Sequence, residues 1–228
     1  MEETTPSLEL TDDGSATLRH PFFGETYHSL RGAVGEARHV FIANGLAALD
    51  RDTVRILEIG FGSGLNAWVT LEYARGRNMG IDYTALELYP VASNVADRLG
   101  YTTDPLFAAL HNAPWNTKAA ITDSFSLTKY YTDATLPGNE WEHKNYDIIY
   151  FDAFAPDTQP EMWSPEMFAR LYSALSPGGI LVTYSAKGTV KQALRAAGFK
   201  VLRLPGALGK RHMLKAIKET EPTSYPKE

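Results

Sequence analysis

Four acidic side chains in this chain each stand at or just beyond the end of a short apolar run. They are Glu58, Glu87, Asp133 and Asp152. Apolar runs of this length, bounded by turn residues, predict buried strands. In open α/β sheets, ligands and chemistry gather at the carboxyl ends of the strands. The four acids are therefore the first candidates for ligand binding or catalysis.

The residues after Glu58 form a glycine-rich turn. The sequence reads Glu58-Ile59-Gly60-Phe61-Gly62-Ser63-Gly64, after an apolar run and before a helical segment. This order lets the backbone approach a ligand at a helix N-terminus, because glycine has no Cβ to block it. A dinucleotide fingerprint needs a small residue five positions after its first glycine, and Leu65 stands there. The pattern is instead the one usual for S-adenosylmethionine (SAM), whose ammonium and sulfonium suit an acid at position 58. NAD and a plain tight turn are the weaker alternatives.

Two of the other acids fit the same ligand. Glu87 can accept both hydroxyls of a ribose lying across the sheet, and a solvated strand end is the plainer alternative. Asp133 follows the run Leu127–Thr132 and is predicted to face the adenine amino group. Asp123 is its rival, but it precedes the run, where a turn role fits better. The predicted cofactor site comprises Glu58, Gly60, Phe61, Gly62, Gly64, Asn66, Glu87, Leu88, Asp133 and Asp152.

Asp152 opens the segment Asp152-Ala153-Phe154-Ala155-Pro156. An acid followed by an aromatic residue and a proline resembles the short motif with which amine-directed methyltransferases hold their nucleophile. The alternative is an acid that caps the helix expected near 164–175. Pro156, Pro160 and Pro165 keep that helix at a distance, so we favour the functional role.

The hydrophobic pattern predicts an α/β protein. Strands are expected at 54–59, 82–87, 121–131, 146–151, 179–184, 199–204 and 211–217, and helices at 64–76, 90–99, 104–112, 165–175 and 188–197. Alternation of this kind implies a parallel sheet with helices on both faces. The last two strands are joined by five residues, too few for a helical crossover, so they should pair antiparallel. This is the Rossmann-like architecture of class I SAM-dependent methyltransferases.

The first fifty residues lack this alternation of strands and helices. They predict a hairpin-like turn at Asp12–Ser15 and a helix from about Gly35 to Leu49. We expect an N-terminal extension over 1–50, a methyltransferase domain over 51–218 and a tail over 219–228. The aromatic and polar residues at 21–29 fit either a lid or a docking surface.

Composition narrows the class of protein further. The 228 residues include no cysteine, which excludes disulfides and thiolate metal sites. The His residues lack metal-ligand spacing, and no nucleophile elbow is present. The N-terminus has no apolar targeting segment and no run is long enough to span a membrane, so we expect a cytoplasmic protein. The net charge of −5 is uneven, because residues 187–228 hold ten Lys or Arg and three Asp or Glu. Such a segment fits either a face that binds a polyanion or helix and strand exteriors that happen to be basic.

Several longer strings resemble one family. They are Tyr150-Phe151-Asp152-Ala153-Phe154-Ala155-Pro156, Gln159-Pro160-Glu161-Met162-Trp163, Pro177-Gly178-Gly179, Thr183–Gly188, Gly209–Met213, Asp13–Ser15, Phe23–Ser29 and Glu36–Phe41. The family is the methyltransferase that completes 5-methylaminomethyl-uridine at the tRNA wobble position. It occurs as half of a bifunctional bacterial enzyme and as a stand-alone protein. The resemblance covers about residues 8–218, and the segment 152–163 is its most specific part.

The resemblance implies methyl transfer from SAM to the primary amine of 5-aminomethyl-(2-thio)uridine 34, with tRNA as partner and no metal. Asp152 would orient the neutral amine, and Tyr27 joins it among the predicted catalytic residues. The uracil ring would stack on an aromatic shelf. The predicted substrate contacts are Phe154, Ala155, Pro156 and Trp163. The candidates for the shelf are Phe154, Tyr27 and Trp163, and a core position is the alternative for each of them. Phosphates of the anticodon stem would meet the basic strip Lys187, Lys191, Lys210 and Arg211.

Two departures from the family pattern matter. The bifunctional version carries a flavin oxidase domain after this one, whereas this sequence ends at residue 228. We therefore expect a separate oxidase or other upstream tRNA-modifying enzymes to supply the aminomethyl substrate. The family usually has an acid where His212 stands. Three other functions are the alternatives: a methyltransferase acting on a protein or small-molecule amine, a catalytically silent SAM-binding module, and an NAD-dependent oxidoreductase. Leu65 and Glu58 disfavour the last of these.

Overall fold

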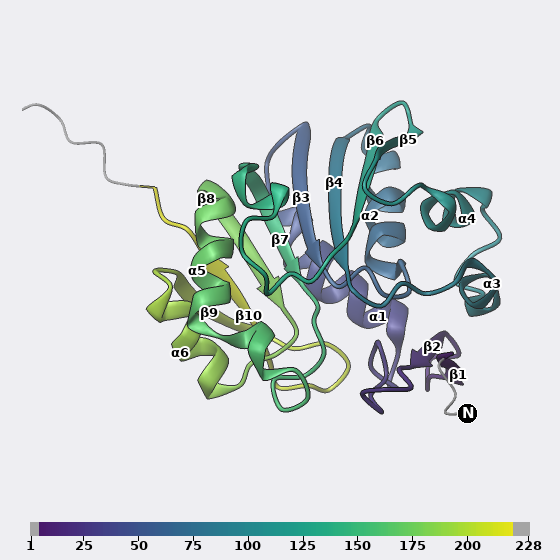
Figure 1. Cartoon of the computed structure of the whole chain (residues 1–228), viewed down its shortest axis with the longest axis horizontal. Coiled ribbons are helices and arrows are strands. Elements are labelled where there is room, and N and C mark those ends of the chain that lie inside the picture. The colour runs from purple at the N-terminus through teal and green to yellow at the C-terminus, as the bar shows by residue number, and fades with distance from the viewer. Residues whose placement is uncertain (1–4, 221–228) are drawn as a thin grey trace, which may run out of the picture.

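The computed structural model describes residues 5–220, and its centre is an eight-stranded mixed sheet (Figure 1). The strand order is β5-β6-β4-β3-β7-β8-β10-β9. The five central strands β6, β4, β3, β7 and β8 run parallel, and β10 lies antiparallel between β8 and β9. Their bounds are β3 Thr53–Ile59, β4 Gly80–Glu87, β5 Lys118–Thr122, β6 Phe125–Tyr131, β7 Tyr146–Phe151, β8 Leu175–Thr183, β9 Lys200–Pro205 and β10 His212–Ile217. The predicted architecture, including the antiparallel last pair, is confirmed.

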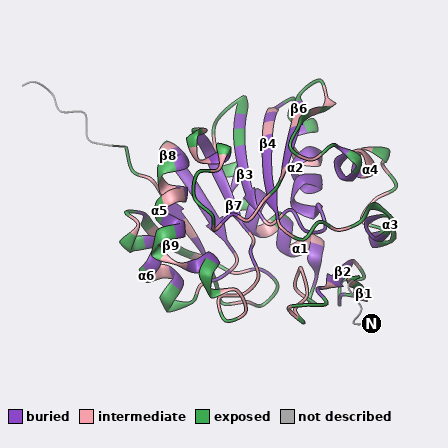
Figure 2. Ribbon diagram, viewed as in Figure 1, coloured by how far each residue is buried: buried purple, intermediate pink, exposed green. Residues whose placement is uncertain are grey.

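Helices cover both faces of this sheet. One face carries α2 (Leu65–Arg75), α4 (Pro105–Asn112) and the short α3 (Ser93–Ala96), and the other carries α5 (Pro165–Ala174) and α6 (Gly188–Ala196). Successive strand residues point to opposite faces: Ile56 packs in the core beneath α2, whereas Leu57 packs in the core beneath α5. Figure 2 shows the resulting buried sheet between helices whose outer sides are exposed. This alternation decides where the strand-end acids point.

The N-terminal extension packs on the α2 side of the sheet. Strands β1 (Ser7–Leu10) and β2 (Ala16–Arg19) form the predicted hairpin, with Leu8 opposite Leu18. The expected helix over 35–49 is instead three short pieces: α1 (Ala33–Ala37), a π-helical turn (Arg38–Ala43) and a 3-10 turn (Leu46–Ala48). Gly45 breaks it, since a Cβ there would lie 2.3 Å from the Phe41 carbonyl oxygen. Residues 20–29, which we call the cover segment, connect the hairpin to α1.

Two further sequence predictions need correction. The strand expected over 121–131 is the antiparallel pair β5 and β6, which turns at Asp123-Ser124. The helix expected over 90–99 shortens to α3 and a 3-10 turn at Asp97–Leu99. Most of the expected tail, 221–228, lies outside the described residues. Within residues 5–220, no helix has the length and apolar character needed to cross a membrane.

Candidate active site

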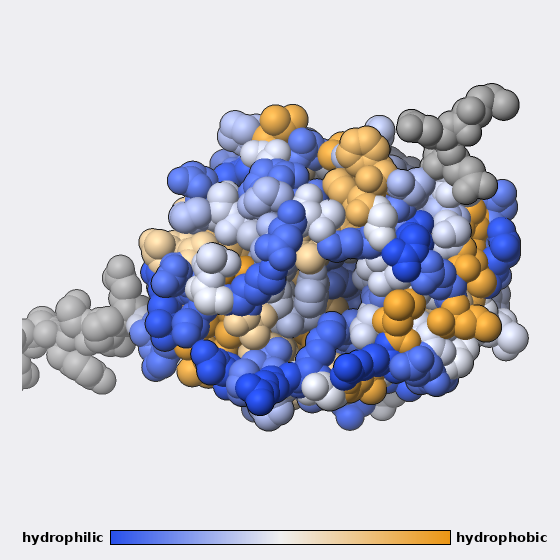
Figure 3. All heavy atoms as spheres, turned by 90° about the horizontal axis from the view of Figure 1, so that it is seen from below, coloured by the Kyte–Doolittle hydropathy of each residue, from blue (hydrophilic) through white to orange (hydrophobic). Residues whose placement is uncertain are grey.

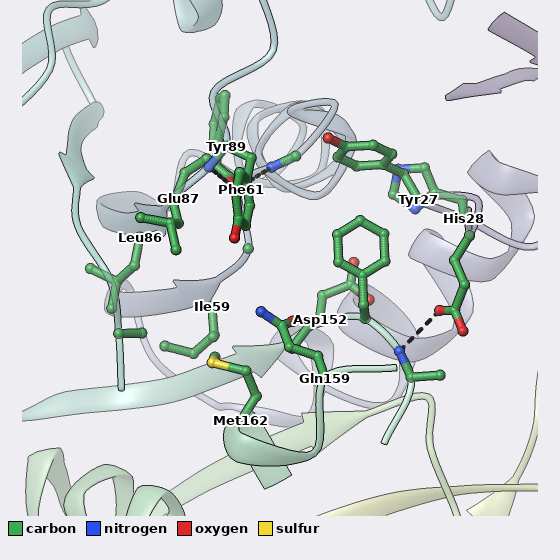
Figure 4. Close-up of a pocket in the computed structure, with 18 of the residues that line it drawn as sticks. Tyr27, His28, Ile59, Phe61, Leu86, Glu87, Tyr89, Asp152, Gln159 and Met162 are labelled. Atoms are coloured by element: carbon green, nitrogen blue, oxygen red, sulfur yellow. Dashed lines mark hydrogen bonds between the residues drawn. The ribbon is translucent and has the colours of Figure 1, made fainter. Parts of the chain in front are cut away.

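An open cavity lies at the carboxyl edge of the parallel strands. Figure 3 views this edge and shows a hollow in it. We call the wall built after β3, β4 and β6 the β4 side. We call the wall built after β7 and β8, by the β9–β10 loop and by the cover segment, the β7 side. Figure 4 shows Glu87 and Tyr89 on the first wall, Tyr27 and His28 opposite, and Asp152 between them.

The glycine turn supplies the floor of the cavity. Gly60 and Gly62 have positive φ angles of 88° and 50°, a region that residues with a Cβ rarely adopt. A Cβ on Gly60 would also lie 2.9 Å from the Asp152 carbonyl oxygen. Gly64 caps α2 and does not line the cavity; a Cβ there would lie 2.7 Å from His111 Nε2. Glycine is therefore needed for the turn at all three positions, and only the first two face a ligand.

Glu87 lies buried at the end of β4 with its carboxylate on the β4 side of the cavity. Its Oε2 accepts a hydrogen bond from the Gly62 amide at 2.8 Å, and its Oε1 accepts one from the Tyr89 amide at 2.6 Å. Burial raises the pKa of Glu87, and these amide bonds oppose that rise. Each oxygen has a second lone pair for a ligand hydroxyl. The geometry fits the predicted ribose contact.

The remainder of the β4 side holds the predicted adenine region. Phe61 and Leu88 line it, as do Thr132, Asp133 and Ala134 after β6. Asp133 Oδ1 accepts bonds from the Thr135 amide and hydroxyl at 2.8 and 2.7 Å, which leaves Oδ2 for other partners. Asp123 lies in the β5–β6 turn, before the amino end of β6 and therefore at the opposite edge of the sheet. Of the two rivals, only Asp133 is placed to meet a ligand.

Glu58 does not face the cavity, which corrects the expectation that it meets the cofactor directly. It is fully buried, because it shares the strand face of Ile56 and points under α2. Its Oε1 accepts a bond at 2.9 Å from Asn66 Nδ2, which also donates to Asp152 Oδ2 at 2.8 Å. Burial raises the pKa of Glu58 well above its ordinary value. Asn66, also predicted to bind cofactor, is thus a link between two carboxyl groups.

Asp152 stands at the centre of the cavity wall, directly after β7. Its amide donates to the Ile59 carbonyl at 3.1 Å, which ties the two strand ends together. Burial raises the pKa of Asp152 to about 7, and the Asn66 hydrogen bond opposes that rise. An isolated aspartate titrates near 4, so the surroundings of Asp152 favour its neutral form more than water does.

Aromatic rings from distant segments meet on the β7 side. Phe154 lies 5.3 Å from Tyr27 and 4.8 Å from Phe23 between ring centroids, and both Tyr27 and Phe154 line the cavity. Burial raises the pKa of Tyr27, and the Glu87 carboxylate adds to that rise. Ala155 lines the cavity too, and its amide donates to Glu25 Oε2 at 3.2 Å, whereas Pro156 lies outside the lining.

Trp163, predicted as part of the same shelf, belongs to the core. It is 6% exposed, packs against Phe151 and Phe168 beneath α5, and does not line the cavity. Its Nε1 donates to the Phe154 carbonyl at 2.8 Å. The 3-10 turn at Pro160–Trp163 directs this ring inward. The role of Trp163 is therefore to hold the backbone of the shelf.

The predicted basic strip divides between surface and cavity. Lys187 is exposed and pairs with Asp157, and Arg211 is exposed at the edge of the β9–β10 loop. Lys191 is half-buried on α6. Lys210 lines the cavity instead, with its ammonium paired to Glu36 of α1. The Lys210 side chain thus lies apart from the other three residues of the strip, and its contact with stem phosphates stays a prediction.

The β7 side and the adjacent end of α1 also contribute lining side chains that were not predicted from the sequence, and five of them are charged, polar or aromatic groups able to contact a ligand. They are Glu25, His28, Glu36, Gln159 and Tyr184. His28 Nε2 lies 2.6 Å from Ser63 Oγ, so it ties the cover segment to the glycine turn, and burial lowers the pKa of His28 to about 4. All five belong to the strings that carried the family resemblance. The resemblance was the sequence signal that could have identified these residues, but it did not indicate where they lie in the structure.

Comparison with known proteins decides the family. A model for S-adenosyl-L-methionine-dependent methyltransferases matches residues 105–219, about half of the chain. The chain belongs to this family. The methyltransferase therefore uses SAM, and the glycine turn and Glu87 both line the cavity. The fold and cofactor expected from the sequence are confirmed.

Relatives of the methyltransferase agree with the resemblance found in its sequence. It is 32% identical over 231 residues to the tRNA 5-methylaminomethyl-2-thiouridine biosynthesis bifunctional protein MnmC of Burkholderia multivorans, covering 91% of this chain and 34% of that protein. The protein of the same name from an Azoarcus species is 34% identical, with 94% and 36% covered. The chain thus spans about a third of these relatives. The crystal structure of MnmC2 from Aquifex aeolicus aligns with a TM-score of 0.75 and 27% identity, over 100% of this chain and 74% of that one.

Proposed function

We propose that the methyltransferase transfers a methyl group to the aminomethyl nitrogen of 5-aminomethyl-(2-thio)uridine at the wobble position of tRNA. The observation that carries the proposal is the position of Asp152, which lies between the glycine turn and the Tyr27–Phe154 rings in one cavity. Bound SAM supplies an electrophilic methyl group on its sulfonium. The names of the MnmC relatives and of MnmC2 support tRNA as the substrate. Cytoplasmic tRNA and an upstream enzyme that supplies the aminomethyl group complete the proposal.

The amine must reach Asp152 with a free lone pair. When the methyl carbon bonds to nitrogen, its bond to sulfur breaks, the electron pair stays on sulfur, and the nitrogen becomes a secondary ammonium. An alkyl ammonium titrates near 10, and Asp152 titrates at about 7. Proton transfer from one to the other is uphill by about three units, or roughly 4 kcal/mol. Asp152 is therefore better suited to orient the amine and to stabilise the ammonium that forms.

The rings on the β7 side provide a place for the uracil. A base extruded from the anticodon loop can stack on an aromatic side chain, and Phe154 directly follows the Asp152-Ala153 pair. Trp163 holds the Phe154 carbonyl from below. Stacking on Phe154 would therefore place the 5-substituent of the base near Asp152. Tyr27 meets the Phe154 ring edge to face, with ring centroids 5.3 Å apart, and lines the same cavity.

Two measurements test the proposed function. Mass spectrometry of wobble nucleosides from cells with and without the gene should show 5-aminomethyl-uridine accumulating when the gene is absent. Purified protein with SAM should methylate tRNA that lacks only the final methyl group and leave free alkyl amines and proteins unmodified. Methylation of an amine-bearing protein or metabolite in place of tRNA would contradict the proposal.

A further inference from the structure

Glu58 is a carboxyl group that does not line the cavity, although it opens the glycine motif. It is fully buried on the face of β3 that packs beneath α2. A carboxyl group in such surroundings costs folding free energy unless its oxygens are hydrogen-bonded. Its Oε1 accepts from Asn66 Nδ2 at 2.9 Å, whereas its Oε2 has no hydrogen-bond partner among residues 5–220. An apolar side chain of similar size would avoid that cost, so the acid is explained by the group it holds.

That group is the side-chain amide of Asn66, in the first turn of α2. Asn66 is only 2% exposed. Its Nδ2 carries two hydrogens, and they are donated to two different carboxyl groups, Glu58 Oε1 and, at 2.8 Å, Asp152 Oδ2. Turning the amide over would set its oxygen against both carboxyl oxygens. Glu58 therefore fixes the way the amide faces, and because a protonated carboxyl also keeps an acceptor oxygen, this does not depend on the charge of Glu58.

The second hydrogen bond of Asn66 determines how the Asp152 carboxyl group lies. The backbone of Asp152 is already fixed, since its amide donates to the Ile59 carbonyl at 3.1 Å. With Oδ2 held by Asn66, Oδ1 is the oxygen left for a ligand in the cavity. Reacting groups need this kind of restraint, because a misplacement of about 1 Å can lower a rate ~100-fold. An Asn66 amide that was free to turn would release the Asp152 carboxyl group as well.

We propose that Glu58 is a positioning residue for methyl transfer: through the Asn66 amide, it holds the Asp152 carboxyl group so that Oδ1 is left for the incoming amine. This inference rests on the proposed function, because the amine is the group that Asp152 meets there. Neither Glu58 nor Asn66 lines the cavity, so the effect of Glu58 on the reaction passes through Asn66 to Asp152. The acid of the glycine motif thus serves the side of the nucleophile.

Two substitutions of Glu58 separate the acceptor oxygen from the charge. Glu58→Leu removes the acceptor, and turnover at saturating SAM and tRNA should fall about fivefold, while SAM affinity and the KM for tRNA stay close to wild type. Glu58→Gln keeps an acceptor oxygen without the charge and should restore most of the lost turnover. Wild-type turnover in Glu58→Leu, or an equal loss in both variants, would overturn the proposal. Glu58→Met takes the place of Glu58→Leu if thermal melting shows that the latter does not fold.

Thr70→Val is the matched control for these substitutions. Thr70 lies one turn after Asn66 on α2 and is buried, and its Oγ1 donates to the Asn66 carbonyl at 2.7 Å. The substitution removes a buried hydrogen bond beside the same residue but leaves the bonds of the Asn66 amide in place. Turnover should therefore stay at the wild-type value. A loss as large as that of Glu58→Leu would show that any change to this part of the core lowers turnover, and would overturn the proposal.

A double-mutant cycle tests whether Glu58 acts through Asn66. Asn66→Ala removes the link, so turnover of the double variant Glu58→Leu, Asn66→Ala should equal that of Asn66→Ala alone. If Glu58 only supported the fold, the two losses would multiply. Multiplied losses would overturn the proposal.

Hydrogen exchange of the Asn66 side-chain amide gives a readout that needs no tRNA. In isotope-labelled protein, with the amide signals assigned by Asn66→Ala, both hydrogens should exchange slowly because they are buried and bonded. Glu58→Leu should speed this exchange about tenfold or more, and Glu58→Gln should keep it slow. Exchange unchanged by Glu58→Leu would overturn the proposal. Absence of tRNA methylation by the wild-type protein would instead sink the proposed function, and the exchange measurement would still decide whether Glu58 holds Asn66.

Discussion

The two sides of the cavity are built in different ways. On the β4 side, the ligand-facing groups follow three neighbouring parallel strands, and backbone amides fix them, as the Gly62 and Tyr89 amides fix Glu87. On the β7 side, side chains far apart in sequence hold one another, as Glu36 and Lys210 do across 174 residues. The first side is a property of the fold, since strand ends of a doubly wound sheet always gather there. The second side depends on contacts between distant segments, and in the proposed function it is the side that receives the nucleophile.

The largest expected effect separates chemistry from cofactor binding. Asp152→Ala should lower turnover at least ~100-fold, about 2.7 kcal/mol of transition-state stabilisation, while SAM affinity stays within a few-fold. Single-turnover methylation and calorimetric SAM binding measure the two quantities. Asp157→Ala is the matched control, because this acid lies five residues later and is exposed. Near-wild-type turnover in Asp152→Ala would remove the β7 side from the reaction.

The Asn66 side chain donates hydrogen bonds to both Glu58 and Asp152, so its loss should affect turnover and pH dependence together. Asn66→Ala removes the donor that lowers the pKa of Asp152. The pKa of Asp152 should rise further above 7, so a smaller fraction is ionised at neutral pH and the acidic limb of the rate profile moves to higher pH. We expect turnover at pH 7 to fall about tenfold. Thr70→Val, one turn later on α2, should keep the wild-type profile, and an unmoved limb in Asn66→Ala would contradict this link.

Substitutions on the β4 side should change SAM affinity rather than turnover, which is the opposite of the result expected for Asp152→Ala. Asp133→Ala should weaken SAM binding about tenfold, as expected for one hydrogen bond to a charged group, with little change in turnover at saturating SAM. Asp123→Ala should change neither, because that residue lies at the other edge of the sheet. Equal effects of the two substitutions on SAM affinity would show that Asp133 does not contact the adenine.

The smallest effects concern the surface that meets tRNA. Charge reversal at Lys187 and Arg211 should weaken tRNA binding and make its salt dependence shallower by roughly 0.7–0.9 for each phosphate that is no longer neutralised. Lys210→Gln should leave the slope unchanged, because Lys210 is turned into the cavity and paired with Glu36. Filter binding over a salt series measures the slopes. The reverse result would return Lys210 to the phosphate-binding strip.

The sequence could predict those candidate residues whose position follows from a neighbouring strand. The glycine turn, Glu87, Asp133 and Asp152 each lie next to a recognisable strand, and the fold brings strand ends together. The prediction for Glu58 was wrong because the acid was placed by its position beside the glycines and not by the two-residue alternation that turns it under α2. For Trp163 the sequence left a shelf position and a core position open, and the short 3-10 turn buries the side chain.

The site residues that were not predicted depend on contacts between distant segments. Nothing local to Glu36 or Lys210 indicates a partner, and the raised pKa of Asp152 arises from burial that only the assembled cavity creates. The cover segment shows the same limit. Its aromatic residues were consistent with a lid or a docking surface, and the structure places Tyr27 in the cavity wall, beside His28, which contacts Ser63 of the glycine turn.

A crystal structure of the methyltransferase with S-adenosylhomocysteine tests the central claim most directly. The account predicts that the ribose hydroxyls bond to Glu87, that the adenine lies beside Asp133, and that the sulfur points along the cavity toward Asp152 and the Tyr27 and Phe154 rings. A product bound elsewhere, or an Asp152 carboxylate turned away from the sulfur, would contradict it.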